Sequence, residues 1–353
     1  MNLDDYTTFA QIDTQNMLAQ IDGLPAQLHQ AWELGQQHPL PAWDGIRQVL
    51  VAGMGGSAIG ADLLAAYLAS KCPIPVVVHR DYGLPAWAEG AHTLVIASSH
   101  SGNTEETLSA FDAALENRCK ILAVATGGRL AESALKSSVP LWTFEHKGQP
   151  RAAVGFSFGL LLAAFSRLNL LPDPQEELMA AIAAMKDQQT SLTADVPVAR
   201  NLAKRLAGQL VGRWVAVFGA GLLAPVSRRW KGQISELAKS WAQFEFLPEA
   251  DHNTLAGVSY PGDLLEHSIA LFLRSASDHP RNRLRLELTR KTLMLEGLNT
   301  DMIDAQGNTP LENLWTCLQL GDYVAYYLAM AYSADPTPIP AIESFKREML
   351  AAG

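Results

Sequence analysis

At 353 residues, with 48% hydrophobic and 18% charged residues, the chain has the length and composition of a two-domain globular protein. Its formal net charge of −9, without a long lysine or arginine run, disfavours nucleic acid and anionic membranes as partners. Three scattered cysteines predict neither a disulfide framework nor a zinc site. The acidic start lacks the features of a signal peptide, and the longest nearly apolar stretch is too short to span a bilayer, so we expect a cytoplasmic protein.

Strand-forming runs alternate with helical patterns through the first half of the chain. The apolar runs that predict strands are 49–52, 75–79, 93–97, 121–125 and 140–144. Helical patterns follow the first, third and fourth runs. Apolar strands joined by helices are typical of a parallel, doubly wound sheet. Two prolines and a charge cluster at 170–177 then interrupt the pattern, so we place a linker there.

The second half of the chain repeats the alternation. Its predicted elements are a strand at 214–219, a helix from about Pro225, a strand at 268–274, a helix near 281–296, a strand at 300–304 and a helix near 310–331. The simplest account is an α/β protein with two similar parallel-sheet subdomains in tandem, at 1–170 and 177–353.

A glycine-rich turn, GMGGSAIG, follows the first predicted strand. Gly55 and Gly56 allow a tight turn that exposes main-chain N–H groups at a helix N-terminus, where the helix dipole favours an anion. Ser57 adds a hydroxyl donor. The same residues fit the G-x-G-x-x-G/A fingerprint of dinucleotide sites, which also includes an acidic residue further along the chain. Asp81 is the candidate for that residue. The spacing to Asp81, however, exceeds the usual distance of about 20 residues.

A second polar stretch, SSHSGNTEET, follows the third predicted strand. We expect Asn103 to cap a helix that starts at Thr104, because Glu106 stands at the spacing of a capping box. Ser99, Ser101 and Thr104 then lie at the carboxyl end of a parallel strand, where doubly wound sheets bind ligands. A phosphate ester accepts many hydrogen bonds, whereas a nicotinamide fold needs no second group of hydroxyls there. The two loops together favour a phosphate site.

Seven motifs occur in order through nearly the whole chain: GMGGSAIGADL, SHSGNTEETL, TGGRL, PRAAVGFSFG, ISELAK, DHN and PIPAIESFK. Together they resemble the bifunctional phosphoglucose/phosphomannose isomerases, within the wider sugar isomerase (SIS) class. The resemblance implies two flavodoxin-like SIS subdomains, each an αβα sandwich, in a homodimer with its active site at the interface. It also implies aldose–ketose isomerisation of hexose 6-phosphates without a metal or cofactor.

The resemblance also assigns roles to individual residues. It implies that Glu236 is the base, that His252 opens the sugar ring, and that Arg151 and Lys346 complete the catalytic group. It places the substrate phosphate on the two polar loops, at Gly55, Gly56, Ser57, Ser99, Ser101 and Thr104.

The chemistry suits these residue types. Isomerisation moves a proton between C1 and C2 through a cis-enediolate, a transfer that one carboxylate can perform. Glu236 lies on a predicted helix. Glu245 and Glu249 are rivals, but the stretch QFEFLPE indicates an extended segment that ends at Pro248, and no motif selects either glutamate. Ring opening suits an imidazole that titrates near neutral pH, and His252 lies in a predicted loop.

The remaining candidates differ in how much the residues alone support them. Arg151 precedes an apolar helix, so its guanidinium can point toward the enediolate and stabilise the negative charge. Lys346 lies on a terminal amphipathic helix, where only the resemblance distinguishes it from a surface lysine. His100 is a competing histidine within the second polar stretch; the family usually has tyrosine there, and we interpret His100 as a lining residue.

Two departures from the family pattern bear on substrate preference. The family often surrounds its glutamate with asparagines, but Ser235 and Leu237 flank it here, and Thr254 follows the motif DHN where an acid is common. Neither departure removes a proton-transfer group. Three alternatives stay open: a non-catalytic sugar-phosphate sensor, a different SIS enzyme for an amino sugar or heptose phosphate, and a nicotinamide dehydrogenase.

Overall fold

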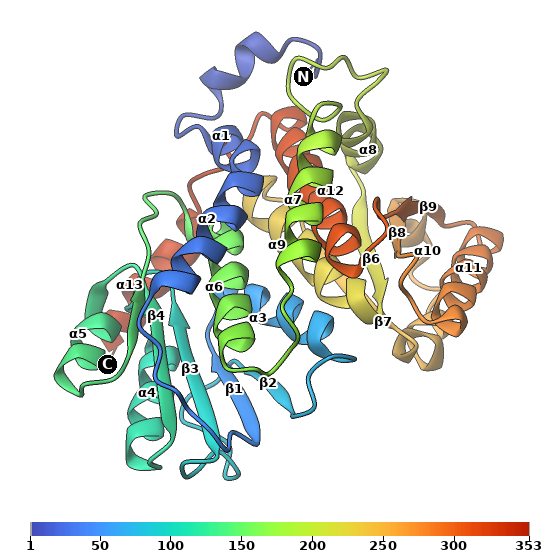
Figure 1. The fold of residues 1–353 in the computed structure, drawn as a ribbon. Helices are drawn as coiled ribbons and strands as arrows, with labels where there is room; N and C mark the ends of the chain where they lie inside the picture. The colour runs from blue at the N-terminus through green and yellow to red at the C-terminus, as the bar shows by residue number, and fades with distance from the viewer. Residues whose placement is uncertain (1, 353) are drawn as a thin grey trace.

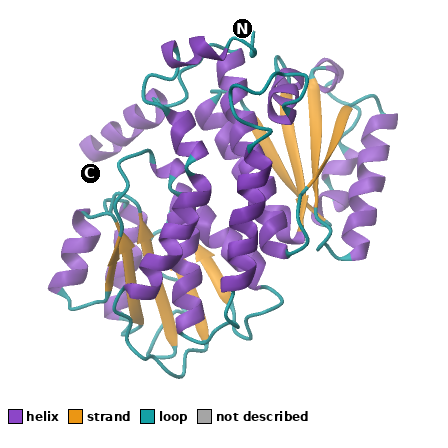
Figure 2. Ribbon diagram, turned by 45° about the horizontal axis from the view of Figure 1, so that its top comes forward, coloured by secondary structure: helices purple, strands orange, loops and turns teal. Residues whose placement is uncertain are grey.

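The computed structural model describes residues 2–352, which form two parallel sheets separated by a layer of helices (Figure 1). The first sheet comes from the N-terminal half of the chain and the second from the C-terminal half. Further helices pack on the outer face of each sheet (Figure 2). This arrangement confirms the predicted α/β class with two doubly wound parallel-sheet subdomains.

The first sheet has the strand order β2-β1-β3-β4-β5. Its strands are β1 (Gln48–Ala52), β2 (Val76–His79), β3 (Thr93–Ser99), β4 (Lys120–Ala125) and β5 (Leu141–Thr143). Every residue of β3 is buried, because helices cover both faces of the sheet. The order reverses between β1 and β3, and doubly wound sheets bind ligands at such a switch point, beyond the carboxyl ends of the strands.

The second sheet has the order β7-β6-β8-β9, which repeats the winding of the first four strands of the first sheet. Its strands are β6 (Trp214–Ala220), β7 (Ala242–Leu247), β8 (Ser268–Arg274) and β9 (Asn299–Asp304). The predicted strand at 268–274 coincides with β8, and the extended segment predicted before Pro248 is β7. The two halves therefore share one topology.

Helices precede, connect and follow these strands. In the first half they are α1 (Met17–Asp22), α2 (Leu24–Gln37), α3 (Gly55–Leu68), α4 (Glu105–Glu116), α5 (Gly128–Lys136) and α6 (Val154–Arg167). In the second half they are α7 (Gln175–Gln189), α8 (Leu202–Leu210), α9 (Ala224–Leu237), α10 (Gly262–Glu266), α11 (Pro280–Leu295), α12 (Pro310–Ala331) and α13 (Pro340–Ala352). Short 3-10 turns are η1 (Tyr6–Gln11), η2 (Pro150–Ala152), η3 (Gly221–Leu223), η4 (Glu249–His252) and η5 (Thr254–Ala256).

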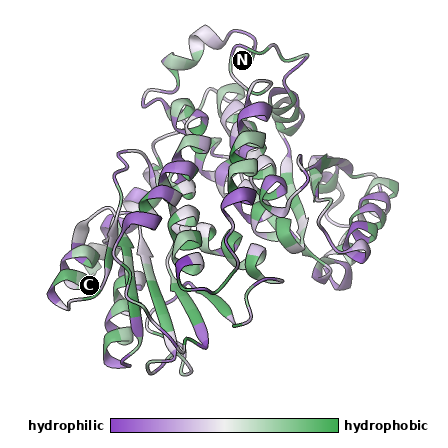
Figure 3. Cartoon of the chain, in the orientation of Figure 1, coloured by the Kyte–Doolittle hydropathy of each residue, from purple (hydrophilic) through white to green (hydrophobic). Residues whose placement is uncertain are grey.

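One hydrophobic core runs continuously between the two sheets. It includes the inward faces of β1, β3, β6 and β8 and the helices α2, α6, α7, α9 and α12. Nearly every residue of α12 between Leu311 and Met330 is buried, and a capping box of Thr309 and Glu312 starts this helix. Figure 3 shows the apolar strands of the first sheet beside these helices.

The loop 168–174 joins α6 to α7 and overlaps the region predicted as a linker. The division of the chain into subdomains at 1–170 and 177–353 stays a prediction. Within residues 2–352, no helix combines the length and the apolar character needed to cross a membrane.

Candidate active site

The glycine turn lies at the N-terminus of α3, directly after β1. Gly55 is the first helical residue and has a φ of +50°, a conformation that glycine adopts without strain. Gly56 has to lack a side chain, because a Cβ atom there would lie 2.5 Å from the Pro150 carbonyl oxygen. This close approach sets η2, which carries Arg151, against the start of α3. Ser57, the next residue of the helix, is buried.

The hydroxyl-rich loop after β3 is bonded to the glycine turn. Ser57 Oγ accepts a hydrogen bond from the His100 main-chain N–H at 3.2 Å. Within the loop, the hydroxyl oxygens of Ser99 and Thr104 are 2.9 Å apart, and Ser99 Oγ also accepts from the Gly102 N–H at 3.1 Å. The structure thus brings the two stretches predicted to bind phosphate to one place, at the carboxyl ends of β1 and β3.

The prediction that Asn103 caps the helix after β3 is wrong. The helix α4 begins at Glu105, and Thr104 takes the N-cap position. The Asn103 side chain instead accepts a hydrogen bond from the Arg129 N–H at 3.1 Å and donates to the Ser101 carbonyl at 3.2 Å. Its amide group therefore joins the loop to α5, a tertiary contact that the local capping pattern does not contain.

Glu236 and Arg151 form the centre of the site. Glu236 lies in the last turn of α9 with its side chain 32% exposed, whereas the Arg151 side chain is 4% exposed. Their Oε2 and NH1 atoms are 3.7 Å apart. The guanidinium also donates to the Pro336 carbonyl at 3.0 Å, to the Thr337 carbonyl, and to Gln149 Oε1 at 3.4 Å. Arg151 is therefore a fixed positive charge beside the predicted base.

Burial lowers the pKa of Arg151, while the Glu236 carboxylate acts in the opposite direction. The guanidinium remains charged, because arginine titrates far above neutral pH. Two buried polar atoms of these residues, Arg151 Nε and Thr337 Oγ1, have no hydrogen-bond partner within residues 2–352.

Lys239 is a further cation at this site, which the sequence analysis did not single out. Its ammonium group donates to the Glu236 carbonyl at 2.5 Å. Partial desolvation lowers the pKa of Lys239 to about 8 although the residue as a whole is exposed, and the charge of Arg151 acts in the same direction. A lysine near the end of a helix is common, so the motif ISELAK alone does not indicate a role.

His100 pairs with a second histidine, His146, which the sequence analysis also did not single out. His100 Nε2 and His146 Nδ1 are 3.0 Å apart, and the rings pack edge to face. Burial lowers the pKa of His100 to about 4, and His146 adds to this effect. Burial likewise lowers the pKa of His146. The uncharged pair ties the hydroxyl-rich loop to the segment that leads to η2.

Two predicted catalytic residues, His252 and Lys346, are not bonded to the central ion pair of Arg151 and Glu236. His252 ends η4 and is exposed, and Lys346 is exposed on α13. Asp251 anchors the turn before His252 through Arg285 at 2.7 Å and Thr289 at 2.6 Å. Within residues 2–352 of one chain, the side chains of His252 and Lys346 form no hydrogen bond or ion pair.

Comparison with known proteins decides the family. Residues 199–349 match the bacterial phospho-glucose isomerase C-terminal SIS domain. The bifunctional phosphoglucose/phosphomannose isomerase of Caldicellulosiruptor bescii is 38% identical over 337 residues, which cover 94% of this chain and 98% of that protein. The protein of the same description from Aquifex aeolicus is 33% identical over 302 residues, which cover 85% and 90%. This chain belongs to the bifunctional phosphoglucose/phosphomannose isomerase family.

The fold of this phosphoglucose/phosphomannose isomerase family member is also found in solved structures. A glucose-6-phosphate isomerase like protein from Thermus thermophilus matches with a TM-score of 0.64 over 96% of this chain and 98% of that one. The two sequences are 20% identical, so this likeness supports the fold alone.

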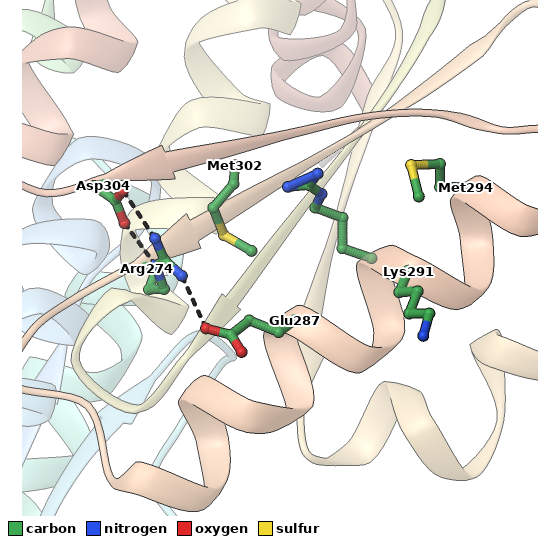
Figure 4. Close-up of a pocket in the computed structure, with 7 residues that line it drawn as sticks. Arg274, Glu287, Lys291, Met294, Met302 and Asp304 are labelled. Atoms are coloured by element: carbon green, nitrogen blue, oxygen red, sulfur yellow. Dashed lines mark hydrogen bonds and ion pairs between the residues drawn. The ribbon is translucent and has the colours of Figure 1, made fainter.

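A pocket of about 340 Å³ in this isomerase family member lies between β8, β9 and α11 (Figure 4). Within it, Arg274 donates to Asp304 at 2.6 Å and to Glu287 at 2.9 Å. Because these carboxylates already pair with the arginine, we assign no substrate phosphate to this pocket. Within residues 2–352, no group of three or more histidine, cysteine or acidic side chains is placed to hold a metal ion.

Proposed function

We propose that the chain interconverts glucose 6-phosphate and mannose 6-phosphate with fructose 6-phosphate. One observation carries the proposal: in a chain of this isomerase family, Glu236 lies 3.7 Å from the buried Arg151, and η2 packs against the N-terminus of α3. A carboxylate beside a fixed cation provides the two groups that proton transfer through an enediolate requires.

Glu236 takes the proton from C2 of the open-chain aldose, and the C1 oxygen becomes an enediolate oxygen that then gains a proton. The same carboxylate returns the proton to C1, and the O2 proton leaves as the C2 carbonyl of the ketose forms. No external oxidant is needed. Glucose and mannose 6-phosphates differ only at C2 and give the same enediolate, so one base serves both. Arg151 stabilises the charge that develops on the enediolate.

The substrate phosphate binds at the two polar loops in this proposal. Its ligands are the hydroxyls of Ser57, Ser99, Ser101 and Thr104 and the main-chain N–H groups of Gly55 and Gly56. Support comes from position, because the N-terminus of α3 and the loop after β3 meet at the switch point of the first sheet. Helix N-termini favour anions through their free N–H groups and dipole.

The proposal includes a cytoplasmic homodimer in which His252 of one subunit opens the sugar ring in the other subunit's site, where Lys346 also contributes. His252 is exposed and unbonded within residues 2–352, which suits a residue that completes a neighbouring site. Farther along the same surface segment, Tyr260 is 87% exposed and offers apolar surface for a subunit contact.

The test measures fructose 6-phosphate formed from each aldose in excess EDTA. Glu236→Gln is compared with wild type and with Glu245→Gln on β7, a matched control that makes the same charge change at a rival carboxylate. We expect wild type and Glu245→Gln to convert both sugars. We expect Glu236→Gln to lose about 10²- to 10⁴-fold in kcat, because it lacks a proton acceptor.

Two results would contradict this proposal. Full activity in Glu236→Gln would exclude this glutamate as the base. A wild-type chain that binds hexose 6-phosphates but converts none would favour a sensor or an enzyme for a different sugar phosphate.

A further inference from the structure

Lys239 has an unusual backbone for a residue with a side chain. It follows α9 with a φ of +56°, in the left-handed region that glycine usually occupies after a helix. Such backbone strain persists where the surrounding structure imposes it, and it is concentrated at functional sites. A glycine there would keep this backbone without strain and remove only the ammonium group, which makes the position suitable for testing what that group does.

The ammonium group lies at the end of α9 that carries Glu236. Its Nζ donates to the Glu236 carbonyl at 2.5 Å, which ties the lysine to the residue that supplies the base. The charged groups that act on it are those of Arg151, Asp335 and Glu236. Within residues 2–352, the Glu236 side chain forms an ion pair with Arg151 alone, and Lys239 contacts the same residue through its main-chain carbonyl.

We propose that Lys239 is a positioning residue for the base: it fixes the last turn of α9 through the Glu236 carbonyl and adds positive charge beside the developing enediolate. This inference rests on the proposed isomerase function. The enediolate is more negative at its oxygens than the bound sugar, so a cation nearby stabilises the transition state more than the ground state. Loss of the ammonium should therefore lower kcat more than it changes KM.

A merely structural role makes a different prediction. A lysine that only interacts with the carbonyl end of a helix contributes to stability and leaves turnover unchanged. Lys239→Gly separates the two roles, because glycine accepts the left-handed backbone and removes only the side chain. Arg118→Gly is the matched control. Arg118 also has a φ of +56°, and it follows α4 at the end opposite the hydroxyl-rich loop.

The experiment measures kcat and KM for glucose 6-phosphate and the melting temperature of full-length wild type, Lys239→Gly, Lys239→Arg and Arg118→Gly. We expect both glycine variants to melt no lower than wild type. We expect Lys239→Gly to lose about tenfold or more in kcat with KM within about twofold, as for loss of a transition-state interaction. Arg118→Gly should keep wild-type kinetics, and Lys239→Arg should retain most activity because it keeps a charge.

The pH profile adds a readout that a structural role would not change. Because the pKa of Lys239 is lowered to about 8, the wild-type kcat should fall as the pH rises through this value. Lys239→Arg should move that alkaline limb to higher pH, since arginine stays protonated. An active wild type with unchanged kcat in Lys239→Gly would overturn this inference alone. A wild type that isomerises neither sugar would overturn the proposed function and this inference with it.

Discussion

Acidification should destabilise this protein through the His100–His146 pair. The two ring nitrogens are 3.0 Å apart, and burial lowers the pKa of His100 to about 4. In the unfolded chain this histidine titrates near its ordinary value of 6.5. Between these two values the unfolded state binds a proton that the folded state does not. Stability therefore falls as the pH decreases through this window and is regained as it rises.

The size of the effect follows from the two pKa values. At about pH 5, preferential protonation of the unfolded state corresponds to about 2 kcal/mol, compared with a few tenths at about pH 7. Because the His100 ring is only partly buried, solvent screening reduces the expected difference to about 1 kcal/mol. The lowered pKa of His146 acts in the same direction.

Urea unfolding of wild type and His100→Phe at about pH 7 and about pH 5 measures this contribution. Phenylalanine keeps an aromatic ring beside Phe144 but does not titrate. Titrating groups away from this pair affect both proteins alike and cancel in the comparison, whereas any change at His146 is measured together with the loss of His100. We expect wild type to lose about 1 kcal/mol more than the variant on acidification. Equal losses would refute the argument, because they would show that His100 is protonated equally in the folded and unfolded states.

Two further predictions concern the dimer and the turn before α3. Mixed Glu236→Gln and His252→Ala chains should recover about a quarter of wild-type activity, since half the dimers are mixed and each has one intact site. No recovery after proven subunit exchange would place both groups in one subunit. Gly56→Ala should destabilise the fold by about 1–3 kcal/mol in urea unfolding and lower kcat/KM, because its Cβ would lie 2.5 Å from the Pro150 carbonyl. Gly208→Ala in α8, which meets no atom within 4 Å, should stabilise by about 0.5–1 kcal/mol; equal effects would contradict the packing argument.

The strands could be predicted from the sequence because buried strands consist mostly of apolar residues. The strand β3 is covered on both faces, so it reads as a continuous apolar run, and its predicted range differs from the observed one only at the carboxyl end. The start of α4 could not be predicted as well. Asn103 matches a capping box, but its amide bonds to α5, and the choice between these partners depends on tertiary packing.

The site was only partly predictable for a related reason. The two stretches proposed to bind phosphate could be found locally, as hydroxyls and glycines that follow strands, because parallel strands bring their carboxyl ends to one edge. The ion pair of Arg151 and Glu236 could not be predicted from local sequence, because it depends on how η2 and α9 pack. Only the family resemblance selected these two residues. Lys239 and His146 gave no local signal, because a left-handed lysine and a half-buried histidine pair both result from the packing of the folded chain.

The division of groups across the site explains how a chain with a net charge of −9 can act on an anionic substrate. In the proposed function, hydroxyls and helix N–H groups hold the phosphate, and these bind an anion without a formal positive charge. The cations Arg151 and Lys239 lie beside Glu236 instead, where negative charge develops only during the reaction. A cation at the phosphate would strengthen the binding of the substrate and of the transition state equally. A cation at the base stabilises the transition state selectively and so increases kcat.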